Sequence, residues 1–336
     1  MGFFDLVQLQ GLYAEDLNKD TLIYAGELNV SINLFSLVGK KINISSVELK
    51  NSTANLTTNR HNGNFNFQFF IDAFVSEDSS AVVETPTDRS AAWSFGVDEL
   101  LLSNVRFRLN DPYNGLNVKT RIGNLAIEMD EFDLNREIIK AESIHIDQLG
   151  LAVELFQGNS TEISQDTSEL SYQFGAESIS IEKSNVSFID QLGGIHLKTA
   201  IGKLDLTVND FDLIHQKINV ESLKVAQTKF NFNQEPIAAK ETEEISSTDT
   251  ASQDWLVDVG KVNWKEFELN YNDNNVAPTK EGIDFSHLGI HISNLEGSNL
   301  HYNGIKDITA SFSDFSVTED GPNDYSDVSL VCIFKF

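Results

Sequence analysis

The sequence predicts an all-β protein: an elongated chain of tandem units of about eighty residues that together form a curled, open β-sheet groove. Three observations predict this fold. The stretch 116–155 occurs again at 195–234, with Gly123 matching Gly202 and the Phe-Asp-Leu triplet at Phe132 matching the one at Phe211. Apolar and polar residues alternate over short runs, as in half-buried strands. Finally, no amphipathic helix of three turns or more is evident in the pattern.

The composition excludes several classes of protein. The chain has 336 residues, of which 24 are Lys or Arg and 51 are Asp or Glu, giving a net charge of -27. Such a surface repels phosphate groups, so nucleic acid is excluded as a partner. Because 40% of the residues are hydrophobic, a disordered acidic tail is excluded too. No stretch has the roughly 18 consecutive apolar residues of a transmembrane helix.

The first unit spans residues 5–75 and is expected to be a partial repeat. Leu28, Val30 and Ile32 alternate with polar residues, as they would on a strand with one buried face. Residues 64–75, rich in phenylalanine, are expected to close this unit as a further strand. The segment 76–92 that follows is polar and acidic, and we expect a loop there.

Three further units follow, separated by loops of similar composition. The second spans 93–157, the third 172–233 and the fourth 254–336, and we expect the fourth to be cut short. The polar loop 158–171 and the acidic, Ser/Thr-rich loop 234–253 lie between them. Within these units, Asp111, Asp190 and Asp273 each follow a strand-like run, so we expect a turn at each of them.

The sequence offers no catalytic constellation and no cofactor site. Phosphate-binding loops, nucleophile elbows and zinc-binding helices have no counterpart here. His287 and His291 would lie about 13 Å apart on a strand, at ~3.3 Å per residue, which is too far to share a metal ion. Asp133 and Asp212 are interpreted as turn residues that accept hydrogen bonds from backbone amides. We therefore expect neither an enzyme nor a metal protein.

The apolar residues of the repeats are the remaining candidates for a functional surface. They admit two interpretations: they fill a closed core between two packed sheets, or they line the concave face of one curled sheet that stays open to a guest. A shift of one residue in register would turn the whole set to the other face. The candidates for the lining are Val105, Phe107, Leu125, Ile127, Met129, Ile144, Ile146, Val186, Phe188, Leu204, Leu206, Val208, Leu223 and Val225.

This repeat style resembles a known family. The alternating run 28–32 and the run from Ile42 to Asn51 lead into units that open near Trp93 or Trp255 and continue into an Asn-Val-x-Phe strand. The combination resembles the AsmA-like family and, within it, the TamB group of translocation and assembly module proteins. The resemblance covers nearly the whole chain as a repeat style.

The resemblance implies a non-enzymatic protein of the periplasm, anchored in the inner membrane by a segment that is not present in this sequence. It implies a β-sheet groove that carries phospholipid or another acyl-chain lipid between the inner and outer membranes. It also implies support of outer-membrane protein assembly through an outer-membrane partner of the TamA/BamA type, bound by regions absent here.

Two alternatives stay open. One is a structural or adhesive β-solenoid spacer, with a closed, packed core and its function in the acidic loops. The other is a chaperone-like groove that accepts unfolded β-strands by edge pairing. Fatty acids would not compete for such a groove, whereas extended peptides would.

Overall fold

The computed structural model describes most of the chain. The described residues are 4–33, 41–70, 94–133, 136–160, 173–212, 215–237, 255–279, 284–303 and 308–319. The segments expected as loops at 76–92, 158–171 and 234–253 fall largely or wholly outside these ranges. The chain divides into two compact units, which are treated in turn: unit 1 is Met1–Ile146 with Gly150–Tyr172, and unit 2 is Gln173–Phe336 with Asp147–Leu149.

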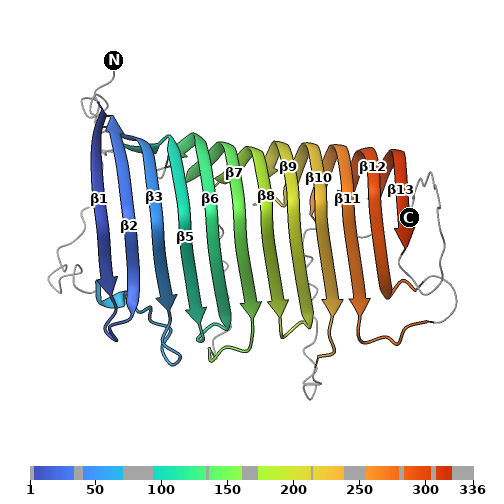
Figure 1. Ribbon diagram of the computed structural model, residues 1–336, viewed down its shortest axis with the longest axis horizontal. Coiled ribbons are helices and arrows are strands. Elements are labelled where there is room, and N and C mark those ends of the chain that lie inside the picture. The colour runs from blue at the N-terminus through green and yellow to red at the C-terminus, as the bar shows by residue number, and fades with distance from the viewer. Residues whose placement is uncertain are drawn as a thin grey trace. The chain divides into compact units, whose positions relative to one another are not determined.

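Unit 1 is a sheet whose strands lie side by side in chain order (Figure 1, blue to green). Its order is β1-β2-β3-β5-β6-β7, and the short β4 pairs with β3 beside β5. The strands are β1 Phe4–Glu15, β2 Thr21–Asn33, β3 Lys41–Thr57, β4 Ser94–Val97, β5 Glu99–Asp111, β6 Leu116–Asp133 and β7 Ile138–Leu155.

Unit 2 is built in the same way, with the order β8-β9-β10-β11-β12-β13 (Figure 1, green to red). Its strands are β8 Gln173–Asp190, β9 Ile195–Asp212, β10 Lys217–Gln234, β11 Leu256–Asp273, β12 His287–Asn303 and β13 Ile308–Glu319. The expected all-β fold, with an open and mostly antiparallel sheet, is confirmed. So is the absence, in the described ranges, of any helix of three turns.

The strands are grouped in threes by their direction. Within a group, neighbours such as β1 and β2, β2 and β3, or β11 and β12 are antiparallel. A third strand then pairs in parallel with the first strand of the next group, as β3 does with β5 and β10 does with β11. Antiparallel neighbours need only a tight turn, whereas a parallel pair needs a longer connection.

Many of the long strands contain one residue in the left-handed backbone region. In the third strands this residue is Asn51, Gln148 or Gln227, with φ of 51°, 59° and 50°. The ladder skips this position: Ala226 pairs with Lys265 and Thr228 with Phe267, but Gln227 is left between them. Such a residue bends a strand, and Figure 1 shows the strands of each unit curling over at one end.

Glycine on the neighbouring strand makes this bend possible. A Cβ on Gly202 would lie 2.5 Å from the backbone oxygen of Gln227, and one on Gly26 would lie 3.0 Å from the Cβ of Asn51. Real side chains do not fit at such distances. The repeated Gly123 and Gly202, found first as a sequence match, therefore fall at the bend of β6 and β9, whereas Ser293 takes the corresponding position in β12.

The Asp turns are as expected. The carboxylate of Asp190 accepts hydrogen bonds from the backbone N–H of Leu192 and of Gly193, at 2.9 and 3.0 Å. Asp133 and Asp212 accept equivalent bonds at 3.1 and 2.9 Å from the backbone three residues further on. These bonds satisfy amide groups that no strand partner reaches.

The prediction of a strand at 64–75 is wrong for the part that is described. Residues 64–70 form turns and one helical turn, held to the sheet by a bridge from Phe65 to Thr58 and by hydrogen bonds between Asn66 and Thr57. Phe65 and Phe67 stack with their ring centroids 5.0 Å apart. The alternating phenylalanines that suggested a strand pack against one another here.

Candidate functional site

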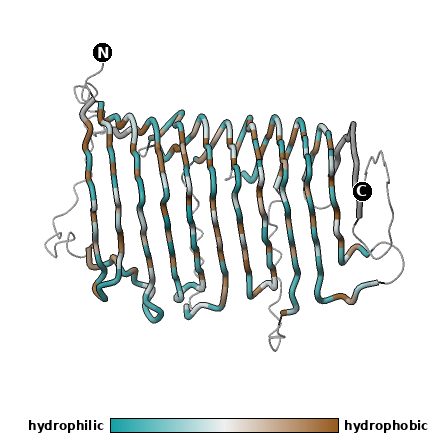
Figure 2. The backbone as a smooth tube through the Cα atoms, viewed as in Figure 1, coloured by the Kyte–Doolittle hydropathy of each residue, from teal (hydrophilic) through white to brown (hydrophobic). Residues whose placement is uncertain are grey.

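The apolar side chains of unit 2 form continuous rows across the sheet. Residues directly opposite each other on paired strands share a face, so the register defines each row. One row joins Ile181 of β8, Leu204 of β9, Val225 of β10, Trp264 of β11 and Leu295 of β12. The next row joins Ile179, Leu206, Leu223 and Val262. Figure 2 shows apolar and polar residues alternating along these strands.

Unit 1 has matching rows. One consists of a leucine on each of β1, β2, β3, β5 and β6, namely Leu9, Leu28, Leu49, Leu102 and Leu125. The row beside it joins Val7, Val30, Val47, Leu100 and Ile127. These rows have the same spacing from the bend as the rows of unit 2. The repeat in the sequence is therefore a repeat of one apolar surface.

The structure places the predicted lining residues as follows. Leu125 and Ile127 lie in the two rows of unit 1, while Leu204, Leu206, Leu223 and Val225 lie in those of unit 2. Val208 faces Val220 in a further row of unit 2. Beyond the bend, Val105 faces Ile122, Phe107 faces Thr120, Val186 faces Thr199 and Phe188 faces Leu197. Met129, Ile144 and Ile146 lie on β6 and β7 and are half-buried.

The bend changes which residues share a face. Before the bend, residues of the apolar face are two positions apart, as Val262 and Trp264 are. Across the bend the spacing is three positions, from Trp264 to Phe267. The rings of Trp264 and Phe267 are nevertheless neighbours, with centroids 4.9 Å apart. The left-handed residue Glu266 between them resets the alternation. Strict alternation along the strand does not predict that Trp264 and Phe267 lie together, although the two charged residues between them, Lys265 and Glu266, were a usable signal.

Most of the apolar face is only half covered. Of the predicted lining residues, Val208 and Val225 are buried and the others are intermediate in exposure. Residues packed between two sheets have neighbours on both sides and lose nearly all their exposure. Within the described ranges, both units consist of one sheet with no second layer on this face.

Unit 2 has one denser region. Val220, Val259, Val262, Ile292 and Leu295 are buried together, and Leu206, Leu223, Trp264 and Phe267 pack against them. The cluster contains residues from both sides of the bend, because curling brings the two arms of the apolar face towards each other. The inside of the bend is thus the best-shielded part of this face.

The opposite face is polar. It carries ion pairs such as Lys229 with Glu268, at 2.6 Å, and Lys203 with Glu182, at 3.2 Å. Hydrogen bonds link Asn270 to Asn231 and Asn272 to Asn233, both at 3.0 Å, across the parallel pair β10 and β11. Exposed pairs of this kind contribute little to stability. The charged groups of this face stay in contact with water.

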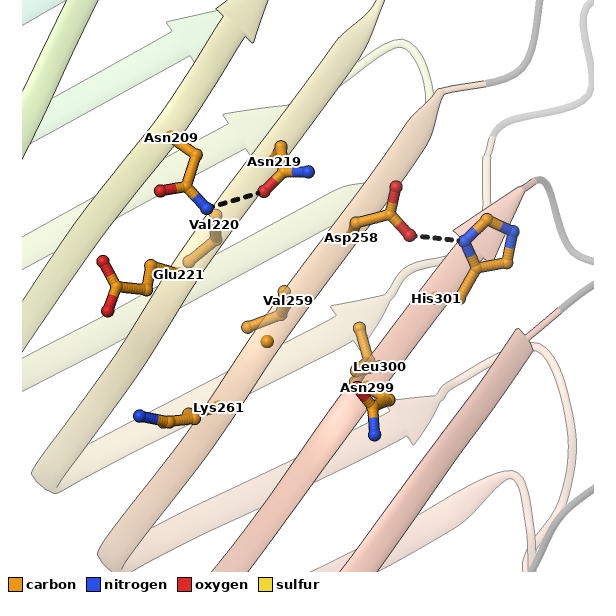
Figure 3. Close-up of a pocket in the computed structure, with 11 residues that line it drawn as sticks. Asn209, Asn219, Val220, Glu221, Asp258, Val259, Lys261, Asn299, Leu300 and His301 are labelled. Atoms are coloured by element: carbon orange, nitrogen blue, oxygen red, sulfur yellow. Dashed lines mark hydrogen bonds and ion pairs between the residues drawn. The ribbon is translucent and has the colours of Figure 1, made fainter.

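A cleft of about 570 Å³ lies at the upper part of β9 to β12 in unit 2 (Figure 3). His301 Nδ1 is 2.6 Å from Asp258 Oδ1, and Asn209 donates to Asn219 at 3.0 Å. Glu221 and Lys261 line it together with Val220, Val259 and Leu300. The ladder between β9 and β10 shifts register at Val220, so regular alternation does not assign the residues beside it to one face. The cleft therefore combines polar groups with residues of the apolar cluster.

Carboxylates of two kinds have a lowered pKa: some lie on strands, such as Glu268, whose pKa is lowered by a hydrogen bond from Lys229, and others lie in turns. Burial of Asp111 acts to raise its pKa, but hydrogen bonds from the Thr58 hydroxyl, at 2.6 Å, and from Asn114 outweigh it and hold the pKa below its ordinary value. The side-chain and backbone N–H groups of Asn275 likewise lower the pKa of Asp273. Both groups are structural anions of the turns.

Other site types have no support in the described residues. No three His, Cys, Asp or Glu side chains gather there in a way that could hold a metal ion. His287 and His291 lie on β12, where each is near a carboxylate of its own, Asp284 and Glu266. None of the described segments is an apolar helix with the length that crossing a bilayer requires.

Comparison with known proteins supports one family. No curated protein matches the chain, and no solved structure matches it. Residues 13–148 match the model of the AsmA family, a segment that begins in β1 and ends in β7. Over this segment, which carries the leucine and valine rows of unit 1 except Leu9 and Val7, the chain is similar to the AsmA family.

Proposed function

We propose that this protein is a non-enzymatic carrier of phospholipid acyl chains, which move along the apolar rows of its sheet. In this proposal the chain is a TamB-like part of a periplasmic bridge between the inner and outer membranes, and it supports outer-membrane assembly. The full-length protein would be anchored in the inner membrane and would meet a TamA/BamA-type partner through regions outside this sequence.

The observation that carries the proposal is a half-covered apolar face that repeats without change. Leu102 and Leu125 in unit 1, and Ile181 and Leu204 in unit 2, are equivalent positions that each leave part of their side chain accessible. A surface of this kind would be costly to expose without a ligand. The match to the AsmA family, whose members are envelope-associated, agrees with a lipid as that ligand.

The energetics favour a carrier of this form. Each methylene moved from water to an apolar surface gains about 0.8 kcal/mol, so a sixteen-carbon tail would cost on the order of 12 kcal/mol to carry through water. Contact with the rows removes most of that cost. Because neighbouring strands present equivalent residues, a tail that moves by one strand loses apolar contacts with one strand and gains similar contacts with the next. The barrier to movement is then small compared with the energy that holds the tail.

Trp264 provides a direct test, because its indole lies in the Ile181–Leu295 row. The chain has three tryptophans. Replacement of Trp93 and Trp255 by phenylalanine leaves Trp264 as the reporter. A phospholipid with bromine atoms in the middle of its acyl chain quenches tryptophan only on contact, so the proposal predicts saturable quenching of Trp264. An unbrominated lipid of the same length competes and restores the fluorescence.

The opposite result is equally clear. If the folded variant shows no quenching at any lipid concentration, and takes up no lipid by native mass spectrometry, the apolar face does not hold acyl chains. The closed spacer would then be the better description. If brominated lipid is bound but Trp264 is not quenched, the lipid lies elsewhere and the proposed path is wrong.

A further inference from the structure

The two units carry different side chains at the same place in the bend. β5 in unit 1 and β11 in unit 2 are both first strands of a group, and their left-handed residues, Asn104 and Glu266, have φ of 51° and 50°. Positions at equal spacing from these two residues are therefore equivalent. The apolar pair that flanks the bend, two positions before it and one position after it, is Leu102 and Val105 in β5 but Trp264 and Phe267 in β11.

In unit 2 the aromatic pair covers the residues beside it. Trp264 lies directly opposite Leu295 on β12, and Phe267 lies directly opposite Ile292. Leu295 is only 3% exposed and Ile292 only 7%. The two rings meet across the bend, with their centroids 4.9 Å apart. The inside of the bend in unit 2 is therefore occupied by side chains of the protein itself.

In unit 1 the equivalent positions leave more room. Leu102 lies opposite Leu125 on β6, and Val105 lies opposite Ile122. All four of these side chains are half-buried. The strand pairing at the bend is the same in both units, whereas an indole or phenyl ring has far more surface than leucine or valine. The difference in cover therefore follows from the size of two side chains.

Packing alone does not explain a tryptophan at position 264. Its indole Nε1 is buried and has no hydrogen-bond partner among the described residues, and a buried donor without a partner costs stability. A leucine, as at the equivalent position of unit 1, packs against apolar neighbours without that cost. What the indole adds is volume at the inside of the bend.

We propose that Trp264 and Phe267 make unit 2 selective for straight acyl chains, whereas unit 1 also accepts methyl-branched chains. This inference rests on the proposed function, the binding of acyl chains by the apolar rows. A straight chain has the same narrow outline along its whole length. A methyl branch adds width, and at the inside of the bend in unit 2 it meets closely packed rings. Added methyl groups in such packing force side chains out of place.

Photocrosslinking of the whole chain tests the inference. The probes are two phosphatidylcholines with a diazirine at the same place in the middle of the acyl chain, which is straight in one and methyl-branched in the other. Mass spectrometry of the digested protein assigns each crosslink to β5 and β6 of unit 1 or to β11 and β12 of unit 2. We expect the straight lipid to label both units. The ratio of branched to straight labelling should be about tenfold lower in unit 2 than in unit 1.

Exchanges between the equivalent positions should move the selectivity from one unit to the other. Trp264→Leu should raise the branched-lipid labelling of unit 2 about tenfold, and Leu102→Trp should lower that of unit 1 by a similar factor. If circular dichroism shows that Trp264→Leu does not fold, Phe267→Val takes its place. Trp255→Leu is the matched control: this tryptophan is 39% exposed and precedes β11, so the same chemical change there should leave the labelling unaltered.

Two results would overturn the selectivity and leave the acyl-chain carrier intact. One is equal labelling of both units by the branched lipid in the parent protein. The other is a folded Trp264→Leu or Phe267→Val variant in which unit 2 still excludes that lipid. In both cases the straight lipid labels both units. If the straight lipid labels neither unit, the result contradicts the carrier itself, and the selectivity that rests on it falls as well.

Discussion

Replacement of Leu204 by Asp distinguishes between two descriptions of the apolar residues, an open face and a closed core. Leu204 is the second residue of its row, between Ile181 and Val225, and is half-buried. A carboxylate there can keep contact with water if the face is open, so the unit stays folded. Leu295, in the same row but only 3% exposed, has no such access to water. Leu295→Asp buries a charge and is expected to prevent folding.

The size of the effect on lipid binding follows from the row geometry. An acyl chain that crosses Leu204 loses apolar contact for about three methylenes when Asp replaces it. At about 0.8 kcal/mol each, that is ~2.4 kcal/mol. Since each 1.4 kcal/mol is a factor of ten, the affinity falls about 50-fold. Thr207→Asp, on the exposed polar face of the same strand, is the control and leaves the affinity unchanged.

The assay is titration of the single-tryptophan variant with brominated lipid, after circular dichroism and thermal unfolding have shown that each protein is folded. If Leu204→Asp unfolds unit 2 as Leu295→Asp does, the row is part of a closed core and the open face is refuted. If Leu204→Asp is folded and binds lipid as tightly as the parent protein, acyl chains do not use this row.

Two further predictions concern stability. Gly202→Ala should destabilise unit 2 by about 1–3 kcal/mol, because the new Cβ meets the Gln227 backbone. Gly150→Ala is the control: the nearest neighbours of its new Cβ are 3.9 Å away, so its free energy of unfolding should change by less than ~0.5 kcal/mol. Urea unfolding of both variants measures the two effects. Asp111→Ala should cost about 1–3 kcal/mol at neutral pH, since the buried Thr58 hydroxyl loses its acceptor. Because the folded-state pKa of Asp111 lies below its ordinary value of 3.8, its contribution is present above that value and is lost as the pH falls through the folded pKa, so parent and variant should converge in acid. Equal urea midpoints for both glycine variants, or a difference for Asp111→Ala that persists in acid, would contradict these two arguments.

The fold class and the turns could be predicted from the sequence because both depend on local patterns. Alternation at Leu28, Val30 and Ile32 requires only that one face of a strand is apolar. The turn at Asp190 requires only a carboxylate within reach of the next two backbone amides. Neither depends on which strands are neighbours.

The bend could not be predicted in the same way. Gln227 and Glu266 adopt a conformation that side chains of their type rarely favour, and the reason lies on neighbouring strands, in the close approach of Gly202 and in the matching bend of the parallel strand. The residues that share a face beyond the bend, such as Trp264 and Phe267, follow from that pairing. For the same reason the sequence could offer lining candidates only strand by strand, while the rows that join the strands needed the register; that these residues line an open groove stays a prediction.

The constant position of the bend has a consequence for how such chains can change in length. The first and third strands of a group bend at the positions where the strands beside them bend. Duplication or loss of a whole group therefore keeps the rows continuous at the new junction. Gain or loss of one strand would reverse the direction of all later strands, and insertion of one residue would displace a bend such as that at Asn51 from its counterpart at Asn104. The number of strands can therefore change in steps of three while the apolar rows stay in register.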